Sequence, residues 1–286
     1  MIPAGKPVRT IARVLCFLAT WLASPGSAPA TPQIAIVVDD MGRSLAAGRR
    51  VIALPGPVAC AFLPHAPHTP RLAEQAHAAG KEVMLHLPMQ SMAGRALDAG
   101  ALTLDMTRTA FLRTLDEDLA RVPHVVGVNN HMGSLLTRHP GHMTWLMQAL
   151  RDRGLFFVDS RTTHHTVARR IAFEQRLPSR RRDVFLDPEP GIASLQREFR
   201  RLLAIAREKG SALAIGHPYP ETLAFLERTL PELAGTGVSL VPVGTLIARQ
   251  QEKDALWRLS SSHWPRVAKN SRPSPSSTCC AEPASR

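Results

Sequence analysis

Short apolar runs alternate with amphipathic segments along most of this chain, and this alternation constrains its fold more than any other feature. The apolar runs are rich in β-branched residues, as residues 34–38 are, which is typical of buried strands. The segments between them repeat apolar residues at helical spacing, and several end at a glycine. The pattern predicts strands over residues 34–38, 58–63, 82–87, 124–128, 155–158, 183–186, 212–215 and 238–243, and helices over residues 69–79, 107–121, 141–153, 191–209 and 221–230.

Strands that are each followed by a helix or a long loop indicate a mostly parallel α/β sheet. We predict one such domain over residues 31–249, either a β/α barrel of seven or eight strands or a doubly wound sheet. No glycine-rich phosphate loop and no internal repeat occur in it. After Arg249 the composition shifts to serine, proline and basic residues, so we predict a disordered tail over residues 250–286.

The start of the chain has the pattern of a secretory signal peptide. Basic residues precede an apolar stretch over residues 14–23, and Ala28-Pro29-Ala30 forms a small-residue cleavage site. The apolar stretch is short for a membrane span, and an uncleaved anchor is the alternative. We predict a signal peptide over residues 1–30 and an exported protein of the periplasm or cell envelope.

The chain is strongly basic, with a formal net charge of +12 and arginine clusters at residues 169–170 and 180–182. A platform for nucleic-acid strands needs interleaved aromatic residues, and this chain has a single tyrosine, so we expect no nucleic-acid partner. In an exported protein the charge favours an anionic envelope polymer or a weak contact with an anionic lipid surface. The other interpretation is a solvated basic face. Cys60 is predicted to be a core residue, whereas Cys279 and Cys280 lie in the predicted tail.

Two adjacent carboxylates, Asp39 and Asp40, end the first predicted strand. The carboxyl ends of strands are where open α/β sheets and barrels build their sites. Burying two unpaired carboxylates together costs too much free energy to serve packing alone. A metal ion or a shared proton would resolve the conflict. Otherwise one aspartate caps the next helix and the other is solvated.

Polar side chains follow five later strands, and a parallel sheet places all such ends at one edge. Two or three of His86, His131 and an aspartate suit a divalent metal such as zinc, with a position left for water. The other aspartate can then take a proton from water, and a separate histidine can protonate a leaving group. The polar residues at these strand ends are His86, Asn129, Asn130, His131, Asp159, Arg161, Asp187 and His217.

Six blocks of the sequence, in order, resemble the divergent polysaccharide deacetylase family. They are IVVDDMG from residue 36, HLPM from 86, GVNNHMGS from 127, FVDSRT from 157, RDVFLD from 182 and IGHP from 215. The family consists of exported bacterial proteins related to metal-dependent carbohydrate esterases, and the resemblance runs from about residue 33 to 247. It implies an α/β fold of the distorted, incomplete β/α-barrel type.

The resemblance also implies roles for the metal-site residues. In active deacetylases the first aspartate of the pair is the base and the second binds metal, which makes Asp39 the base and Asp40 a ligand. His86 matches the first of two histidines spaced four apart, but Gln90 stands at the second position. Because a neutral amide oxygen donates weakly to zinc, we assign that place to His131.

His217 matches the late histidine that acts as the acid, and we predict that Asp159 and Asp187 orient it or Arg161. We also predict Asp159 as a further catalytic residue. The family's Arg-x-Pro-aromatic loop is absent where residues 129–132 stand. We assign substrate binding to Asn129, Asn130, Arg161 and Asp187.

The predicted function is an exported, zinc-dependent hydrolase that removes N- or O-acyl groups from an envelope polysaccharide or a peptidoglycan-like glycan. The alternative is a catalytically weak or inactive envelope module that binds glycan or a protein partner. A third interpretation is a barrel scaffold whose basic surface binds anionic lipid or polymer.

Overall fold

The sheet at the centre of this protein consists entirely of parallel strand pairs. The computed structural model describes residues 31–94 and 96–262. Within them the strand order is β6-β5-β4-β3-β2-β1-β8-β7, with β9 beside β1. The strands are β1 Gln33–Met41, β2 Ala59–Phe62, β3 Val83–Met89, β4 Val125–Met132, β5 Phe156–Asp159, β6 Ser179–Arg181, β7 Val184–Phe185, β8 Ser211–Gly216 and β9 Ser239–Leu240.

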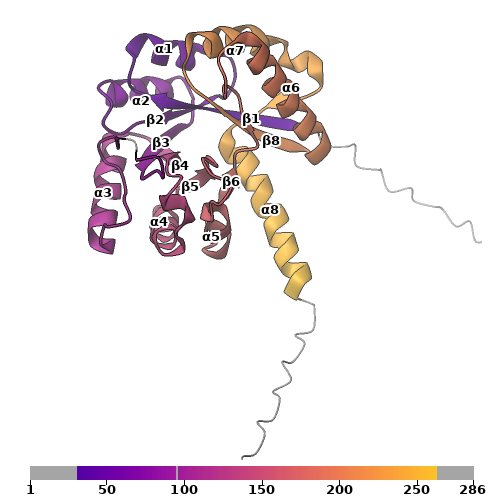
Figure 1. Ribbon diagram of the computed structural model, residues 1–286. Helices are drawn as coiled ribbons and strands as arrows, with labels where there is room; N and C mark the ends of the chain where they lie inside the picture. Colours follow the sequence, from indigo (N-terminus) through magenta and orange to yellow (C-terminus); the bar gives the residue numbers. More distant parts are fainter. Residues whose placement is uncertain (1–30, 95, 263–286) are drawn as a thin grey trace, which may run out of the picture. The chain divides into compact units, whose positions relative to one another are not determined.

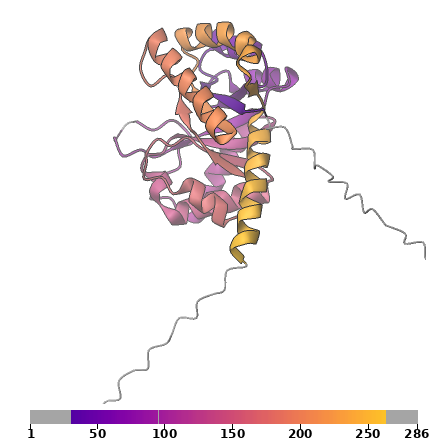
Figure 2. The same cartoon turned by 90° about the vertical axis from the view of Figure 1, so that its right-hand side faces the viewer.

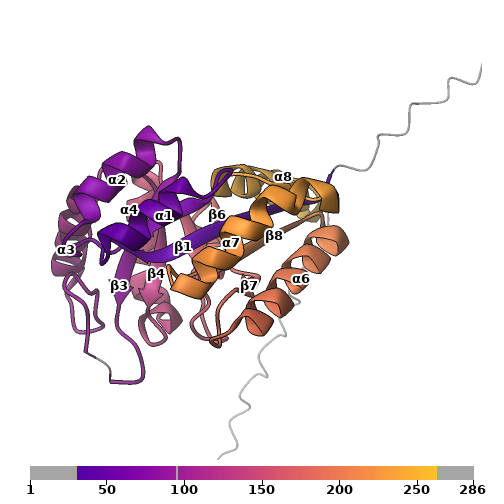
Figure 3. The same ribbon diagram turned by 90° about the horizontal axis from the view of Figure 1, so that it is seen from above.

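The sheet curls into an incomplete barrel, which confirms the predicted fold class (Figure 3). Its two edge strands, β6 and β7, follow each other in the sequence but do not pair, so the barrel stays open between them. All of the α-helices except the last line the outside (Figures 1 and 3). The α-helices are α1 Leu45–Ala53, α2 Thr69–Ala78, α3 Arg108–Arg121, α4 Pro140–Asp152, α5 Ala168–Glu174, α6 Ile192–Lys209, α7 Pro220–Glu232 and α8 Val243–Ser262.

Alternation along β1 divides the buried side chains into two cores. Ile34, Ile36 and Val38 belong to a large cluster that they share with the outer helices. Ala35 and Val37 belong to a smaller cluster. Because successive side chains of a strand point to opposite faces, the first cluster packs the outer face of the sheet and the second fills the inside of the barrel.

Helix α8 closes this inner cluster with its first turn. Its residues Val243, Leu246 and Ile247 are buried in the inner cluster, and the Glu82 carboxylate accepts hydrogen bonds from the backbone N–H groups of Val243 and Gly244 at 2.6 and 2.9 Å. From there the helix extends away from the sheet (Figure 2). No helix in the described part of the chain is both long enough and apolar enough to cross a membrane.

Helix α8 also corrects one boundary of the sequence analysis. Residues 250–262, predicted to start a disordered tail, continue this helix, whereas residues 263–286 and the predicted signal peptide lie outside the described residues.

The sequence analysis did not predict β6, α1 and α5. Strand β6 reads Ser-Arg-Arg and offers no apolar signal, while α5 spans only seven residues. Cys60 is buried, as predicted.

Candidate metal centre and active site

A bulge at the end of β1 turns two neighbouring carboxylates toward the same histidine. Val38 pairs with Cys60 and Met41 with Phe62, so β1 carries one extra residue here. Asp40 has a φ of 54°, in the left-handed region. Adjacent residues of a regular strand point to opposite faces, and a bulge re-aims one of them.

The two carboxylates meet at His86. Its Nε2 lies 3.6 Å from Asp39 Oδ2 and 3.3 Å from Asp40 Oδ1. The register between β3 and β4 places a second histidine, His131, near His86. His86 pairs with Asn129, and Pro88 pairs with His131. Asn129 and His131 are two residues apart and therefore share one face of the sheet.

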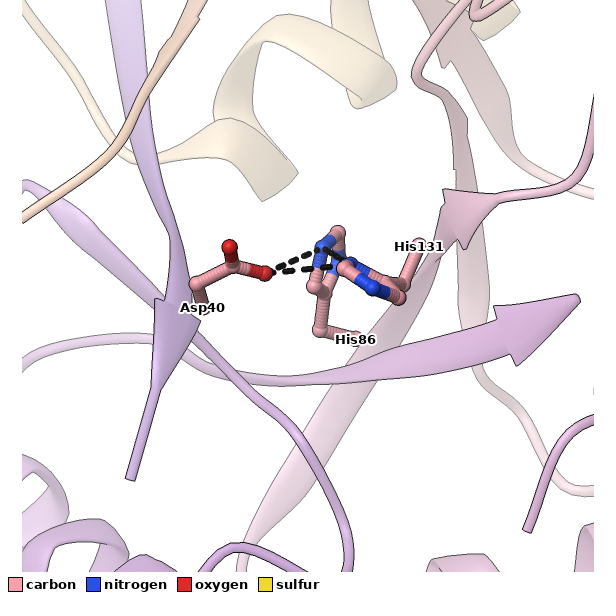
Figure 4. Close-up of side chains that lie close together, drawn as sticks. All are labelled: Asp40, His86 and His131. Atoms are coloured by element: carbon pink, nitrogen blue, oxygen red, sulfur yellow. Dashed lines mark hydrogen bonds and ion pairs between the residues drawn. The ribbon is translucent and has the colours of Figure 1, made fainter. Parts of the chain in front are cut away.

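Three donor atoms form a nearly equilateral triangle at this edge (Figure 4). His131 Nδ1 lies 3.0 Å from His86 Nε2 and 3.0 Å from Asp40 Oδ1, and the remaining side of the triangle is 3.3 Å. Donors about 2.0–2.1 Å from a tetrahedral zinc ion stand about 3.3 Å apart. The cluster therefore fits a divalent cation held by one carboxylate and two imidazoles.

Further side chains orient these histidines. His86 Nδ1 donates to Asn129 Oδ1 at 2.9 Å, which leaves His86 Nε2 directed at the triangle. His131 Nε2 lies 3.0 Å from Asp98 Oδ2, which leaves His131 Nδ1 on the cluster side. Arg43 in turn donates to both oxygens of Asp98, at 2.9 and 3.1 Å. Such outer partners fix the tautomer and the direction of metal-binding imidazoles.

The buried charges give each group a distinct protonation state. Burial raises the pKa of Asp39, although His86 and His217 oppose the shift. Burial would also raise the pKa of Asp40, but His131 and His86 hold it well below its usual range. Burial alone would lower the pKa of His86, yet the two carboxylates outweigh it and raise the pKa to about 9. Without a metal, the site therefore holds a proton on His86 beside an ionised Asp40.

His217 follows β8 and faces the same aspartates. Its backbone N–H donates to Asp187 Oδ2 at 2.7 Å, and its Nδ1 lies 3.0 Å from Asp187 Oδ1. Burial would lower the pKa of His217, but Asp187, Asp39 and Asp40 raise it. The exposed Tyr219 ring stacks on the imidazole, with 5.4 Å between the ring centroids. Asp187, which we predicted to bind substrate, thus orients the candidate acid.

The structure separates Asp159 and Asn130 from this chemistry. Asp159 Oδ1 accepts a bond from the Arg161 N–H at 2.9 Å, and Oδ2 accepts one from Thr166 Oγ1 at 3.0 Å. Asn130 donates to the Met132 carbonyl and accepts from the backbone N–H of Ser160, each within the strand-end loops. Both side chains form these hydrogen bonds with the turns that follow β4 and β5. Arg161 is exposed beside them.

Asn129, also predicted to bind substrate, instead lies buried between two site residues. Its Nδ2 donates to Asp39 Oδ1 at 2.7 Å, while its Oδ1 accepts from His86. Gln90 is no ligand, because its Oε1 accepts from the Leu104 N–H and anchors a loop. Sequence reasoning missed Asp98 and Arg43, which lie in loops, where no strand pattern places them at the site.

Fold and site together define an incomplete parallel β/α barrel with a potential metal cluster at the carboxyl edge of its strands. The chain belongs to the divergent polysaccharide deacetylase family, whose model matches residues 36–247.

Three similar proteins accompany this match. An uncharacterized Haemophilus influenzae protein is 38% identical over 220 residues, covering 76% of this chain and 77% of the relative. The uncharacterized protein YibQ of Escherichia coli is 35% identical over 251 residues, covering 88% and 76%. The crystal structure of an uncharacterized protein from Agrobacterium tumefaciens C58 superposes with a TM-score of 0.74 at 26% identity, covering 78% and 92%.

Proposed function

We propose that this protein is an exported, zinc-dependent hydrolase that removes N- or O-acyl groups from an envelope polysaccharide, such as a peptidoglycan-like glycan. The observation that carries the proposal is the triangle of Asp40, His86 and His131 beside the buried Asp39. Membership of the divergent polysaccharide deacetylase family supports a carbohydrate substrate.

Asp40, His86 and His131 would hold the metal. When bound, a divalent ion of this kind polarises a carbonyl oxygen and lowers the pKa of water. Asp39 accepts the proton of the attacking water, because its raised pKa makes it a stronger base than an exposed aspartate. The hydrogen bond from Asn129 keeps its carboxylate directed at the site.

His217 supplies the proton that the leaving amine or alcohol needs. The contact with Asp187 and the nearby charges of Asp39 and Asp40 raise its pKa, which favours the protonated imidazole that an acid requires. Asp187 bonds to its Nδ1, which fixes the ring and leaves Nε2 free for proton transfer. A base and an acid on separate strand ends thus serve opposite sides of one acyl transfer.

The test is acetate release from N-acetylated chitooligosaccharides and from peptidoglycan, with zinc content measured by elemental analysis. We expect Asp39→Asn and His217→Gln to lower turnover about 10²–10⁴-fold. We expect His86→Ala to lose the metal, and the exposed Asp152→Asn on α4 to behave as wild type. Glycan binding without acetate release in the zinc-loaded wild type would support the non-catalytic module instead.

Export has its own measurement. We expect the mature chain to appear in the periplasmic fraction with an N-terminus near Thr31. A full-length chain in the membrane fraction would indicate an uncleaved anchor.

A further inference from the structure

Two adjoining cavities flank the end of β5. One, of about 300 Å³, and another, of about 340 Å³, both include Arg161 and His164 in their walls. They therefore form one continuous surface, which we call the arginine groove. The basic residues that define it are Arg161, His164, Arg169, Arg170, Arg181, Arg182 and Arg201.

Arginines outnumber acids in the walls of the groove. Glu198 pairs with the groove's Arg201 at 3.3 Å and with Arg197, Asp183 lies 3.3 Å from the neighbouring Arg180, and Asp159 bonds to its own loop. By contrast, the guanidinium groups of Arg161 and Arg182 form no ion pair with an acidic side chain of the described part of the chain. The like charges of Arg161 and Arg182 act on each other, which favours binding of an anion between them, while Asp39 and Asp159 oppose this repulsion only without direct contact.

Arg182 is fixed in place before any ligand arrives. Its Nε donates to the Ser160 carbonyl at 2.6 Å and its Nη2 to the Arg161 carbonyl at 3.1 Å. Its guanidinium also lies 4.8 Å from the centroid of the Phe185 ring. These neutral partners hold the side chain without cancelling its charge. A guanidinium held in this way loses little rotamer freedom on binding.

The groove adjoins the reacting groups through a short chain of hydrogen bonds. Arg182 bonds to the backbone of Ser160, and Ser160 Oγ accepts from Asn129 Nδ2 at 3.3 Å. The same Nδ2 donates to Asp39 Oδ1 at 2.7 Å. The groove therefore adjoins the candidate base, and the charge of Asp39 acts on Arg182.

Backbone strain marks the same place. Arg161 has a φ of 50°, in the left-handed region that residues other than glycine seldom adopt. Strained residues of this kind cluster at ligand clamps.

We propose that the arginine groove binds a carboxylate carried by the sugar next to the acylated one, so that the protein selects acidic over neutral polysaccharide. This inference rests on the proposed hydrolase function and names its substrate class. A planar carboxylate matches the guanidinium fork with two parallel hydrogen bonds, whereas a neutral hydroxyl does not.

Calorimetric binding to two tetrasaccharides of equal length tests the proposal. The hyaluronan tetrasaccharide carries carboxylates on alternate sugars, whereas chitotetraose carries only N-acetylglucosamine. We expect the purified protein to bind the hyaluronan probe at least about tenfold more tightly. We expect Arg161→Ala to remove this preference. The exposed Arg113→Ala on α3 removes the same charge outside the groove and should leave the preference intact.

Equal affinity of the wild type for both probes would overturn the inference, and so would equal weakening by Arg161→Ala and Arg113→Ala. Retention on phosphatidylglycerol vesicles that depends on Arg161, without a preference for hyaluronan, would assign the groove to a lipid surface and reject a glycan. The binding readout is independent of turnover. A hyaluronan preference without acetate release from any glycan would therefore reject the hydrolase alone, and acetate release without the preference would reject the groove alone.

Discussion

Zinc binding to this protein should displace a proton from His86. The two aspartates raise the pKa of this buried imidazole to about 9, and only the neutral imidazole can bind a metal. Because the raised pKa keeps the ring protonated below pH 9, zinc affinity should rise with pH and level off above pH 9. At pH 7, two units below the pKa, the affinity should be about 100-fold below its limit, or about 2.7 kcal/mol.

Titration calorimetry at pH 6.5, 7.5 and 8.5 measures this dependence. Repeating each titration in buffers of different ionisation enthalpy counts the protons released. We expect the affinity to change about tenfold per pH unit and the His86 proton to appear in the buffer. The matched control is His68→Ala, since His68 precedes α2 without a side-chain capping bond.

Two results would refute this reasoning in different ways. A zinc affinity that stays constant from pH 6.5 to 8.5 would mean that His86 is already neutral in the metal-free protein. Zinc binding that survives in both His86→Ala and His131→Ala would place the metal elsewhere.

Three further predictions concern the surroundings of the site and the stability of the fold. Asp98→Asn should weaken zinc binding about 10–100-fold in a chelator competition, because His131 loses its carboxylate partner. Glu82→Gln should lower the free energy of unfolding in urea by about 1 kcal/mol, since it weakens the cap of α8. Asp118→Asn should raise that free energy at pH 8 by on the order of 5 kcal/mol, which is about 1.36 kcal/mol for each of about four pH units.

The sign of the Asp118 effect follows from burial, which raises its pKa to about 8. The unfolded state loses this proton near pH 4, so wild-type stability should fall between pH 4 and 8, whereas asparagine removes that dependence. A variant whose stability tracks the wild type across this range would show that Asp118 is already ionised. Unchanged zinc affinity in Asp98→Asn, or unchanged unfolding in Glu82→Gln, would show that those contacts contribute nothing.

Local patterns sufficed for much of this fold because apolar runs and helix ends are local properties. The alternation predicted most strands, and the resemblance predicted an incomplete barrel. The sequence signal failed where an element carries no apolar residue, as in β6, or where capping acts over a long distance. Helix α8 is an example of the second case, since Glu82, far away in the sequence, bonds to its first turn.

In the candidate site, too, local patterns predicted some residues, whereas contacts between distant parts of the chain placed others. Asp39, Asp40, His86 and His131 could be predicted because strand ends of a parallel sheet meet at one edge. Their outer partners could not, because Asp98 reaches His131 from a loop whose course no periodicity encodes. Residue type also could not predict that both oxygens of the Asp159 carboxylate accept hydrogen bonds within the loop that follows β5.

Gln90 stands where the family's motif has a histidine, and the pairing of neighbouring strands explains where the second imidazole comes from. Two histidines four residues apart on one segment are one way to place two imidazoles at a metal. In this chain the parallel pairing of β3 and β4 brings His131 within 3.0 Å of His86 from a neighbouring strand. Gln90 meanwhile bonds to the loop that follows β3. With Gln90 at that position, the second imidazole of the cluster comes from another strand, and the triangle of potential donors is kept.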